Sequence, residues 1–233
     1  MCGRYSLTAP GAVIAEIFAL ADPPEIEARY NIAPTQNAPV VRTDLSGARV
    51  LAALRWGLVP PWAPDLKLAS RMINARVESV SERPAFREAF ERHRCLVPAD
   101  GYYEWQATAA GKLPCRIHRE DGTPLAFAGL WSPWLDPKTR EKIETFTILT
   151  CPATPELAAI HDRMPVILPP ARWSDWLDAR VPDLGDAAAL SRDGARDLTF
   201  TRLGPRINNV AHDDPECWAP PVAVLRRQLG LFD

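Results

Sequence analysis

Residues 95 to 151 form a series of strand-like segments separated by turn signals, and this pattern constrains the fold more than any other feature of the chain. The segments are CLVPADGYYEWQ, LPCRIHR, LAFAGLW and KIETFTILTC, with the turn sequences AAGK and DGT after the first and second. Consecutive strands with short connections pair antiparallel, as a meander. Because these strands do not alternate with long helices, a parallel βαβ architecture is disfavoured. The pattern predicts an α+β domain built on an antiparallel sheet.

The remaining predicted elements are short and flank this sheet. Apolar periodicity and turn residues predict helices over 10–20, 84–94, 154–160 and 170–179, a hairpin joining 40–43 to 48–60, and a last helix or strand over 221–230. The proline-rich segment 21–39 is predicted to be an ordered loop. Since no internal repeat or linker-like tract divides the chain, we predict a single domain over residues 1–233.

Composition and charge fit a soluble globular protein of a reducing compartment. The chain has 233 residues, 47% of them hydrophobic, which is enough to bury a substantial core. A formal net charge of −2 argues against a protein that wraps nucleic acid around its whole surface. It does not exclude a local basic groove, because net charge averages over all faces. The five cysteines are widely spread without a C-x-x-C pair, which indicates a reducing compartment and no structural zinc.

The segment SLTAPGAVIAEIFALAD has the length and the small-residue ending of a secretory signal. Glu16 interrupts its apolar run, however, and Val13, Ile17 and Leu20 fall on one helical face. An amphipathic helix is therefore the better interpretation. Nothing else in the sequence approaches transmembrane length, so no membrane partner is expected.

A cysteine follows the initiator methionine in the opening MCGRY. Removal of Met1 would give Cys2 a free α-amine beside its thiol. The pKa of an α-amine is about 7.7–8.0, against about 10.4 for lysine, so far more of it is nucleophilic at neutral pH. Such an aminothiol reacts with an aldehyde to form a five-membered thiazolidine, because the thiol closes on the imine within one molecule. The alternative, that the position of Cys2 is incidental, stays open at this point.

Two further segments offer groups for proton transfer. In DGYYEWQ, strand alternation sends Tyr102 and Glu104 to one face of the strand. A carboxylate among aromatic side chains is partly desolvated, which raises its pKa toward the range useful for proton transfer. A glutamate of an edge strand that faces water is the alternative. In IHDRMPVIL, His161 offers an acid or base for neutral pH, and a structural histidine is the alternative.

Two segments offer groups that could hold nucleic acid. INARVES places the Asn74 amide and the Arg76 guanidinium two residues apart, on one face if extended, where they could orient a polar group and hold a phosphate. RWGLVPPWAP places Trp62 next to a stiff di-proline, and a rigid exposed aromatic ring can stack on bases or wedge between them. The alternative for Asn74 and Arg76 is an ordinary surface position, and the alternative for Trp62 is packing in the core. The loop RYNIAPTQ, with Asn31 and Pro34, has no interpretation from its chemistry alone.

These motifs, in this order, resemble the SOS response-associated peptidase (SRAP) family. The matching stretches are MCGRY, RYNIAPTQ, RWGLVPPW, INARVES, CLVPADGYYEW and IHDRMPVIL, from residue 2 to about 168. The chain beyond them matches less distinctly, apart from INNV at 207–210. The resemblance implies a single SRAP domain with an antiparallel, barrel-like β core and short flanking helices.

The resemblance implies a sensor of abasic sites that crosslinks itself to the aldehyde of the ring-opened sugar, preferentially in single-stranded DNA, and so protects the site during the damage response. Cys2 would form the crosslink, and Glu104 would assist proton movement during imine formation. His161 would act in ring opening, strand incision or crosslink reversal. Asn74 would help to position the N-terminus and the sugar.

The same resemblance implies the residues that would bind DNA. They are Arg4 and Arg76 on flanking phosphates, Trp62 and Pro61 in a loop that stacks or wedges, and Asn31 and Pro34 in RYNIAPTQ. No cofactor and no metal ion are implied. The expected state is a monomer in the cytoplasm, associated with the nucleoid when it acts on DNA.

Two other classes of function use the same residues. The first is a cysteine peptidase or amidohydrolase in which Cys2 is an N-terminal nucleophile and its freed α-amine the base. Self-removal of Met1 would combine this activity with crosslinking. The basic and aromatic residues around the motifs argue against it, since peptide hydrolysis does not need them. The second is a non-catalytic binder of modified bases, in which Cys2 is incidental.

Overall fold

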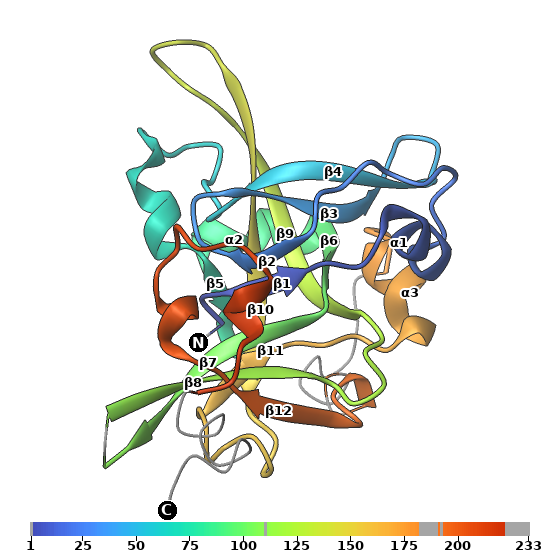
Figure 1. Cartoon of the computed structure of the whole chain (residues 1–233). Coiled ribbons are helices and arrows are strands. Elements are labelled where there is room, and N and C mark those ends of the chain that lie inside the picture. The colour runs from blue at the N-terminus through green and yellow to red at the C-terminus, as the bar shows by residue number, and fades with distance from the viewer. Residues whose placement is uncertain (1, 110, 182–190, 192, 222–233) are drawn as a thin grey trace, which may run out of the picture.

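The described residues, 2–109, 111–181, 191 and 193–221 of the computed structural model, form two β-sheets with short helices at their periphery (Figure 1). The strands are β1 (Tyr5–Leu7), β2 (Arg29–Ile32), β3 (Asn37–Thr43), β4 (Arg49–Trp56), β5 (Asn74–Arg76), β6 (Arg94–Ala99), β7 (Gly101–Thr108), β8 (Gly111–Arg119), β9 (Leu125–Leu135), β10 (Lys142–Pro152), β11 (Arg163–Pro165) and β12 (Leu198–Arg202). The α-helices are α1 (Gly11–Phe18), α2 (Pro84–Arg92) and α3 (Trp173–Leu177), and the 3₁₀ segments are η1 (Leu66–Arg71), η2 (Val77–Ser79), η3 (Pro170–Arg172), η4 (Pro205–Asn208) and η5 (Pro215–Trp218).

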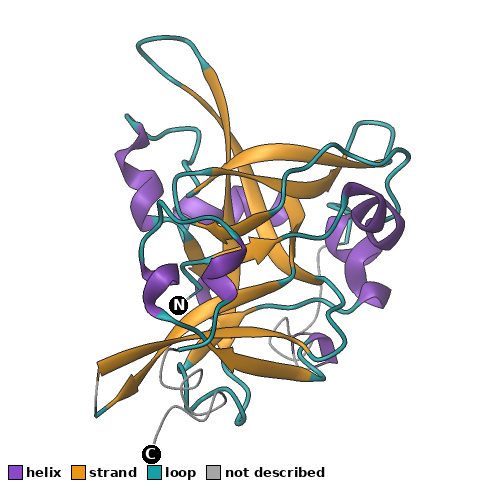
Figure 2. Ribbon diagram, in the orientation of Figure 1, coloured by secondary structure: helices purple, strands orange, loops and turns teal. Residues whose placement is uncertain are grey.

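The larger sheet closes into a barrel. β10 pairs with β4, β4 with β3, β3 with β6, β6 with β9, and β9 again with β10. Closure gives every strand in the ring a neighbour on each side and encloses an apolar core, although β3 pairs with β6 only at Val41 and Leu96. Helices lie outside the strands in Figure 2. The predicted α+β fold with a barrel-like core and short flanking helices is therefore confirmed.

The second sheet has the strand order β12, β8, β7, β1, β2. Its neighbouring strands are all antiparallel. In the barrel sheet, by contrast, β10 runs parallel to both β4 and β5, so the protein is mainly rather than wholly antiparallel. The N-terminal end of the chain lies where the two sheets meet, close to β5 and β7 (Figure 1).

The predicted continuous strand at 95–106 is two strands in different sheets. Between them lies the buried residue Asp100, whose carboxylate accepts hydrogen bonds from the backbone N–H groups of Thr8 and Ala9. Its own N–H donates to the carbonyl of Ser6 at 2.8 Å. These bonds satisfy a buried carboxyl at the bend and hold the chain there. The predicted meander is therefore wrong in its connectivity, because β7 pairs with β8 in one sheet and β9 with β10 in the other.

Three of the four predicted helices are confirmed. The helix at 10–20 is α1, that at 84–94 is α2, and that at 170–179 consists of η3 and α3. The helix predicted at 154–160 is wrong, because this segment forms successive turns. Its backbone N–H groups alternate between partners three and four residues back, such as Leu157 and Ala158 on the Thr154 carbonyl, so no regular helix is propagated. In the described parts of the chain, no helix combines the length and the apolar character needed to cross a membrane.

The predicted hairpin of 40–43 and 48–60 is confirmed as β3 and β4. The predicted ordered loop at 21–39 is corrected, since it contains β2 and the start of β3. β2 is held by β1 and by the distant Asp213, whose carboxylate accepts hydrogen bonds from two β2 backbone N–H groups. The element predicted at 221–230 lies outside the described residues, apart from its first residue.

Candidate functional site

Cys2 is fully buried just ahead of β1. Its carbonyl oxygen accepts a hydrogen bond of 2.8 Å from Asn74 Nδ2, and its thiol lies 3.9 Å from the carbonyl oxygen of Arg4. Because β5 pairs with β10, the barrel fixes the amide that holds Cys2. Burial, followed by the charge of Glu104, raises the pKa of the Cys2 thiol well above its ordinary value. The resting thiol is therefore protonated at neutral pH.

Glu104 lies on β7 and is buried on the same face of the strand as Tyr102. The pairing of Tyr5 with Tyr102 brings the N-terminal end of the chain next to this face. Burial raises the pKa of the Glu104 carboxyl, while the nearby His161 acts in the opposite direction. Glu104 therefore holds a proton at higher pH than an exposed glutamate does.

His161 faces Glu104 from the turn before β11. Its Nε2 atom lies 4.0 Å from Glu104 Oε2, and its Nδ1 atom accepts a hydrogen bond of 2.9 Å from the backbone N–H of Arg163. A neutral ring that accepts at Nδ1 carries its proton on Nε2, which is the nitrogen facing Glu104. Asp162 Oδ1 is also 2.9 Å from Nδ1 and can pair with the ring when both nitrogens are protonated. Tyr102 and other apolar side chains line the narrow hollow beside this pair.

The structure brings the four predicted catalytic residues together. Asn74 contacts Cys2, the charge of Glu104 acts on the Cys2 thiol, and His161 lies beside Glu104. They come from the N-terminal end, β5, β7 and the turn before β11, so both sheets contribute. Among the described residues, no three His, Cys, Asp or Glu side chains are grouped so as to hold a metal ion. The site offers a thiol, a protonatable carboxyl, an imidazole and an amide.

The predicted DNA-binding residues of two segments lie on the surface. Arg76 is exposed at the end of β5, two residues after Asn74. Pro61 and Trp62 are exposed on the loop after β4, and Trp62 keeps 61% of its surface accessible. This loop is closely supported, because a Cβ atom at Gly57 (φ 118°) would lie only 2.3 Å from a backbone oxygen of η1. A fixed backbone thus carries the exposed indole.

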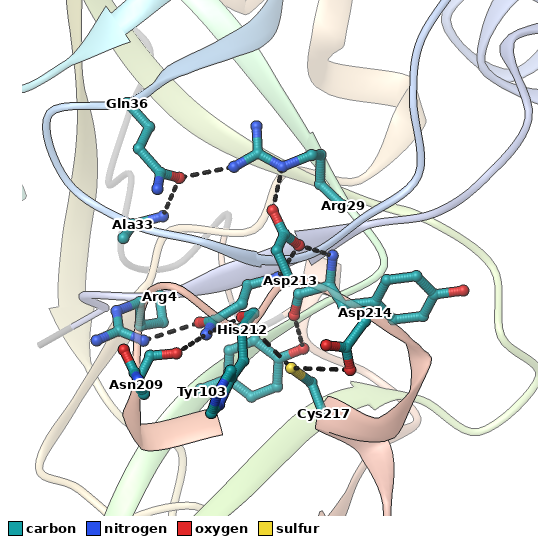
Figure 3. Close-up of polar contacts among 12 residues, drawn as sticks. Arg4, Arg29, Ala33, Gln36, Tyr103, Asn209, His212, Asp213, Asp214 and Cys217 are labelled. Carbon is teal, nitrogen blue, oxygen red and sulfur yellow. Dashed lines mark hydrogen bonds and ion pairs between the residues drawn. The ribbon is translucent and has the colours of Figure 1, made fainter. Parts of the chain in front are cut away.

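Arg4 is tied to the C-terminal segment 205–218. Figure 3 shows Arg4 beside Asn209 and His212 of this segment. Its Nη1 atom donates to Asn31 Oδ1 at 2.8 Å and to the carbonyl oxygen of Ile207 at 3.1 Å. Asn31 is fully buried, and its Nδ2 atom lies 2.7 to 3.3 Å from three carbonyl oxygens of that segment. Asn31 therefore anchors the segment, and Pro34 lies half-buried in the turn after β2. The structure places Arg4 and Asn31 in one network, apart from the exposed Trp62.

Sequence reasoning missed the acidic member of this network. The Asp213 carboxylate pairs with Arg29 and accepts hydrogen bonds from the backbone N–H groups of Tyr30, at 2.5 Å, and Asn31, at 2.8 Å (Figure 3). It also missed the ion pair between Glu78 and Arg163. The dense polar run NNVAHDD around Asp213 is the signal that could have indicated the first of these. The second has no sequence pattern, because its partners are far apart in the chain.

Sequence comparisons give the chain clear relatives. The family model for SOS response associated peptidase (SRAP) matches residues 1–210. Abasic site processing protein YoqW of Bacillus subtilis (strain 168) is 37% identical over 221 residues, which cover 93% of this chain and 98% of YoqW. Abasic site processing protein HMCES of Xenopus tropicalis is 31% identical over 239 residues, which cover 90% of this chain and 71% of HMCES.

Solved structures show the same fold. A crystal structure of a protein from Bacteroides thetaiotaomicron superposes with a TM-score of 0.79 at 24% identity, covering 95% of this chain and all of that one. A crystal structure of a protein from Bordetella bronchiseptica superposes with a TM-score of 0.70 at 30% identity, covering 87% of this chain and all of that one.

Proposed function

This chain belongs to the SOS response associated peptidase (SRAP) family, and we propose that it processes abasic sites in DNA by trapping them covalently. The reactive form is the chain without Met1, whose N-terminal Cys2 carries both a free α-amine and a thiol. Its target is the aldehyde that an abasic sugar exposes when its ring opens. The observation that carries the proposal is the Asn74 hydrogen bond to the Cys2 carbonyl, since it fixes this terminus beside Glu104.

The first stage is condensation of the amine with the aldehyde. The α-amine nitrogen attacks the aldehyde carbon and gives a carbinolamine, whose hydroxyl must leave as water. Glu104, with its raised pKa, supplies the proton for this departure, and a protonated imine results beside the Glu104 carboxylate. Position matters here, because holding the amine next to the aldehyde makes the reaction effectively unimolecular.

The second stage is ring closure by the thiol. The Cys2 thiol is protonated at rest, so a base must take its proton as the sulfur adds to the imine carbon. The Glu104 carboxylate left by the first stage can accept that proton, and the nitrogen keeps the hydrogen it carried in the protonated imine. One water is lost overall, and a thiazolidine joins protein to sugar. Glu104 thus serves as acid and then as base.

His161 is the proposed acid or base for proton transfers at the sugar. Its Nε2–H faces Glu104, while its ring is 30% exposed and can exchange protons with solvent. Ring opening, strand incision and crosslink reversal each need a proton moved at a sugar or imine atom, and an imidazole can do this at neutral pH. We assign His161 to these steps.

Single-stranded DNA is the proposed partner. The exposed Arg76 lies beside Asn74 and can hold a phosphate next to the trapped sugar. The exposed Trp62 and Pro61 can stack on or wedge between bases, which an unpaired strand allows most readily. Arg4 is the second proposed phosphate ligand. Its Nη1 atom is held by Asn31 and by the Ile207 carbonyl oxygen, so the orientation of its guanidinium is fixed.

The test is the intact mass of the protein after incubation with a single-stranded oligonucleotide that carries one abasic site. The expected product is a covalent adduct of the chain lacking Met1, with the mass of protein plus DNA minus one water. Cys2→Ala is the matched control and should give no adduct. If the chain without Met1 gives no adduct, the crosslinking function is refuted and an N-terminal-nucleophile hydrolase takes its place.

A further inference from the structure

An ion pair joins the two strands that flank the end of β10. Glu78 lies in η2, directly after β5, and Arg163 is the first residue of β11. Both strands pair with β10, on opposite edges, because Thr150 is the partner of Arg76 on β5 and of Pro165 on β11. The contact between Glu78 and Arg163 therefore spans β10.

The ion pair is bidentate and has further support from β10. The Nη1 and Nη2 atoms of Arg163 donate to the two carboxylate oxygens of Glu78, the second at 3.0 Å. Nη2 also donates to the Thr150 carbonyl oxygen at 2.6 Å and lies 3.2 Å from its hydroxyl. Two parallel bonds to one carboxylate fix the guanidinium plane as well as its place. We call this contact, between Glu78 in η2 and Arg163 in β11, the brace.

Each end of this brace is continuous with one half of the proposed site. Four residues before Glu78, Asn74 holds the Cys2 carbonyl. The backbone N–H of Arg163 holds His161 Nδ1 and so directs Nε2 toward Glu104. A shift of β5 against β11 would change the separation between Cys2 and His161.

We propose that Glu78 is a positioning residue, which acts through Arg163 to hold His161 at its working distance from Cys2 and Glu104. This role rests on the proposed function. Glu78 itself is 45% exposed and Arg163 only 12% exposed, so one end of the brace is screened by solvent. Partly exposed ion pairs contribute little to stability. Removal of the Glu78 charge is therefore expected to change the reaction more than the fold.

The experiment measures single-turnover crosslinking over a range of abasic oligonucleotide concentrations. Glu78→Gln is expected to lower the plateau rate constant about tenfold, since a small misplacement of reacting groups has effects of this size. The half-saturating DNA concentration should stay the same or fall, because a negative charge near the DNA is removed. Glu82→Gln, the same change on an exposed neighbour, is the control and should keep the plateau rate.

A double-mutant cycle tests the route through Arg163. In an Arg163→Gln background, Glu78→Gln should have no further effect on the plateau rate, because its partner is already absent. Independent, additive effects would overturn the proposed route. The reaction amplitude reports the folded fraction, so a variant that loses amplitude but keeps its rate constant would show a purely structural role and also overturn it.

The outcome separates this role from the proposed function. A wild-type chain that forms an adduct, together with a Glu78→Gln plateau rate within twofold of wild type, refutes the positioning role alone. A wild-type chain lacking Met1 that forms no adduct refutes the crosslinking function and the role together. If Glu78→Gln does not fold, Glu78→Asp keeps the charge but shortens the reach, and the same loss of plateau rate is expected.

Discussion

The Nε2 atom of His161 lies 4.0 Å from Oε2 of Glu104, and the two side chains differ in exposure, at 30% and 6%. The carboxyl is therefore the buried member of the pair, and the imidazole is the member that solvent reaches. Burial raises the pKa of the Glu104 carboxyl above that of an exposed glutamate. The proposed reaction, which both donates and accepts a proton, would use this arrangement of a buried carboxyl beside a more exposed imidazole.

Glu104→Gln is expected to slow the covalent step at every DNA concentration. The substitution keeps the size of the side chain but removes the proton that the carbinolamine needs and the base that the thiol needs. The expected loss is about 10² to 10⁴ in the single-turnover rate, the usual contribution of a general acid–base group. The half-saturating DNA concentration should stay at the wild-type value. An unchanged rate at saturating DNA would contradict the proton-transfer role.

The same substitution is expected to stabilise the fold at neutral pH. The pKa of Glu104 is raised in the folded state, so between the unfolded and the folded pKa the folded chain binds more protons. In that window the free energy of unfolding falls as pH rises. Glutamine does not titrate, so the free energy of unfolding of Glu104→Gln should not fall with pH in this window. Thermal unfolding followed from pH 4 upward should show a Tm advantage of the variant that grows as the pH rises through this window. A Tm difference independent of pH would argue against the raised pKa.

Arg76→Ala is expected to weaken DNA capture and to leave the chemistry intact. Arg76 is exposed beside the site, so its loss should remove one phosphate contact. The half-saturating DNA concentration should rise about five- to tenfold, and the slope of affinity against salt concentration should fall by about one. Saturating DNA should restore the crosslinking rate. If it does not, Arg76 acts in the reaction itself.

The sequence predicted what local patterns determine. Apolar periodicity located α1 and α2, and the apolar segments around DLSG located the hairpin of β3 and β4. Strand alternation put Glu104 on a buried face, and the motif residues Cys2, Asn74 and His161 do lie together.

Distant contacts explain what the sequence could not predict. The strand at 95–106 divides because the Asp100 carboxylate is satisfied by N–H groups more than 90 residues earlier in the chain. β2 depends on Asp213, which is 182 residues from Asn31. The Glu78–Arg163 pair likewise joins residues 85 positions apart. Such contacts leave no periodic signal in the sequence. A segment whose structure depends on them is therefore predicted as a loop or as a continuous strand.

Asn31→Ala is expected to release the segment 205–218 and, with it, Arg4. The alanine removes the amide that bonds carbonyl oxygens of Ile207, Asn209 and His212, together with the oxygen that accepts from Arg4. Leaving buried partners unsatisfied costs about 1–3 kcal/mol, so the free energy of unfolding should fall by about that amount. Denaturant unfolding measures this fall, and limited proteolysis should cut the released segment sooner than in wild type. Asn37→Ala, at an exposed position, is the control and should change neither readout. If the variant keeps wild-type stability but captures DNA more slowly, Asn31 contacts DNA directly. If both stability and DNA capture fall, capture depends on Arg4 being held in place.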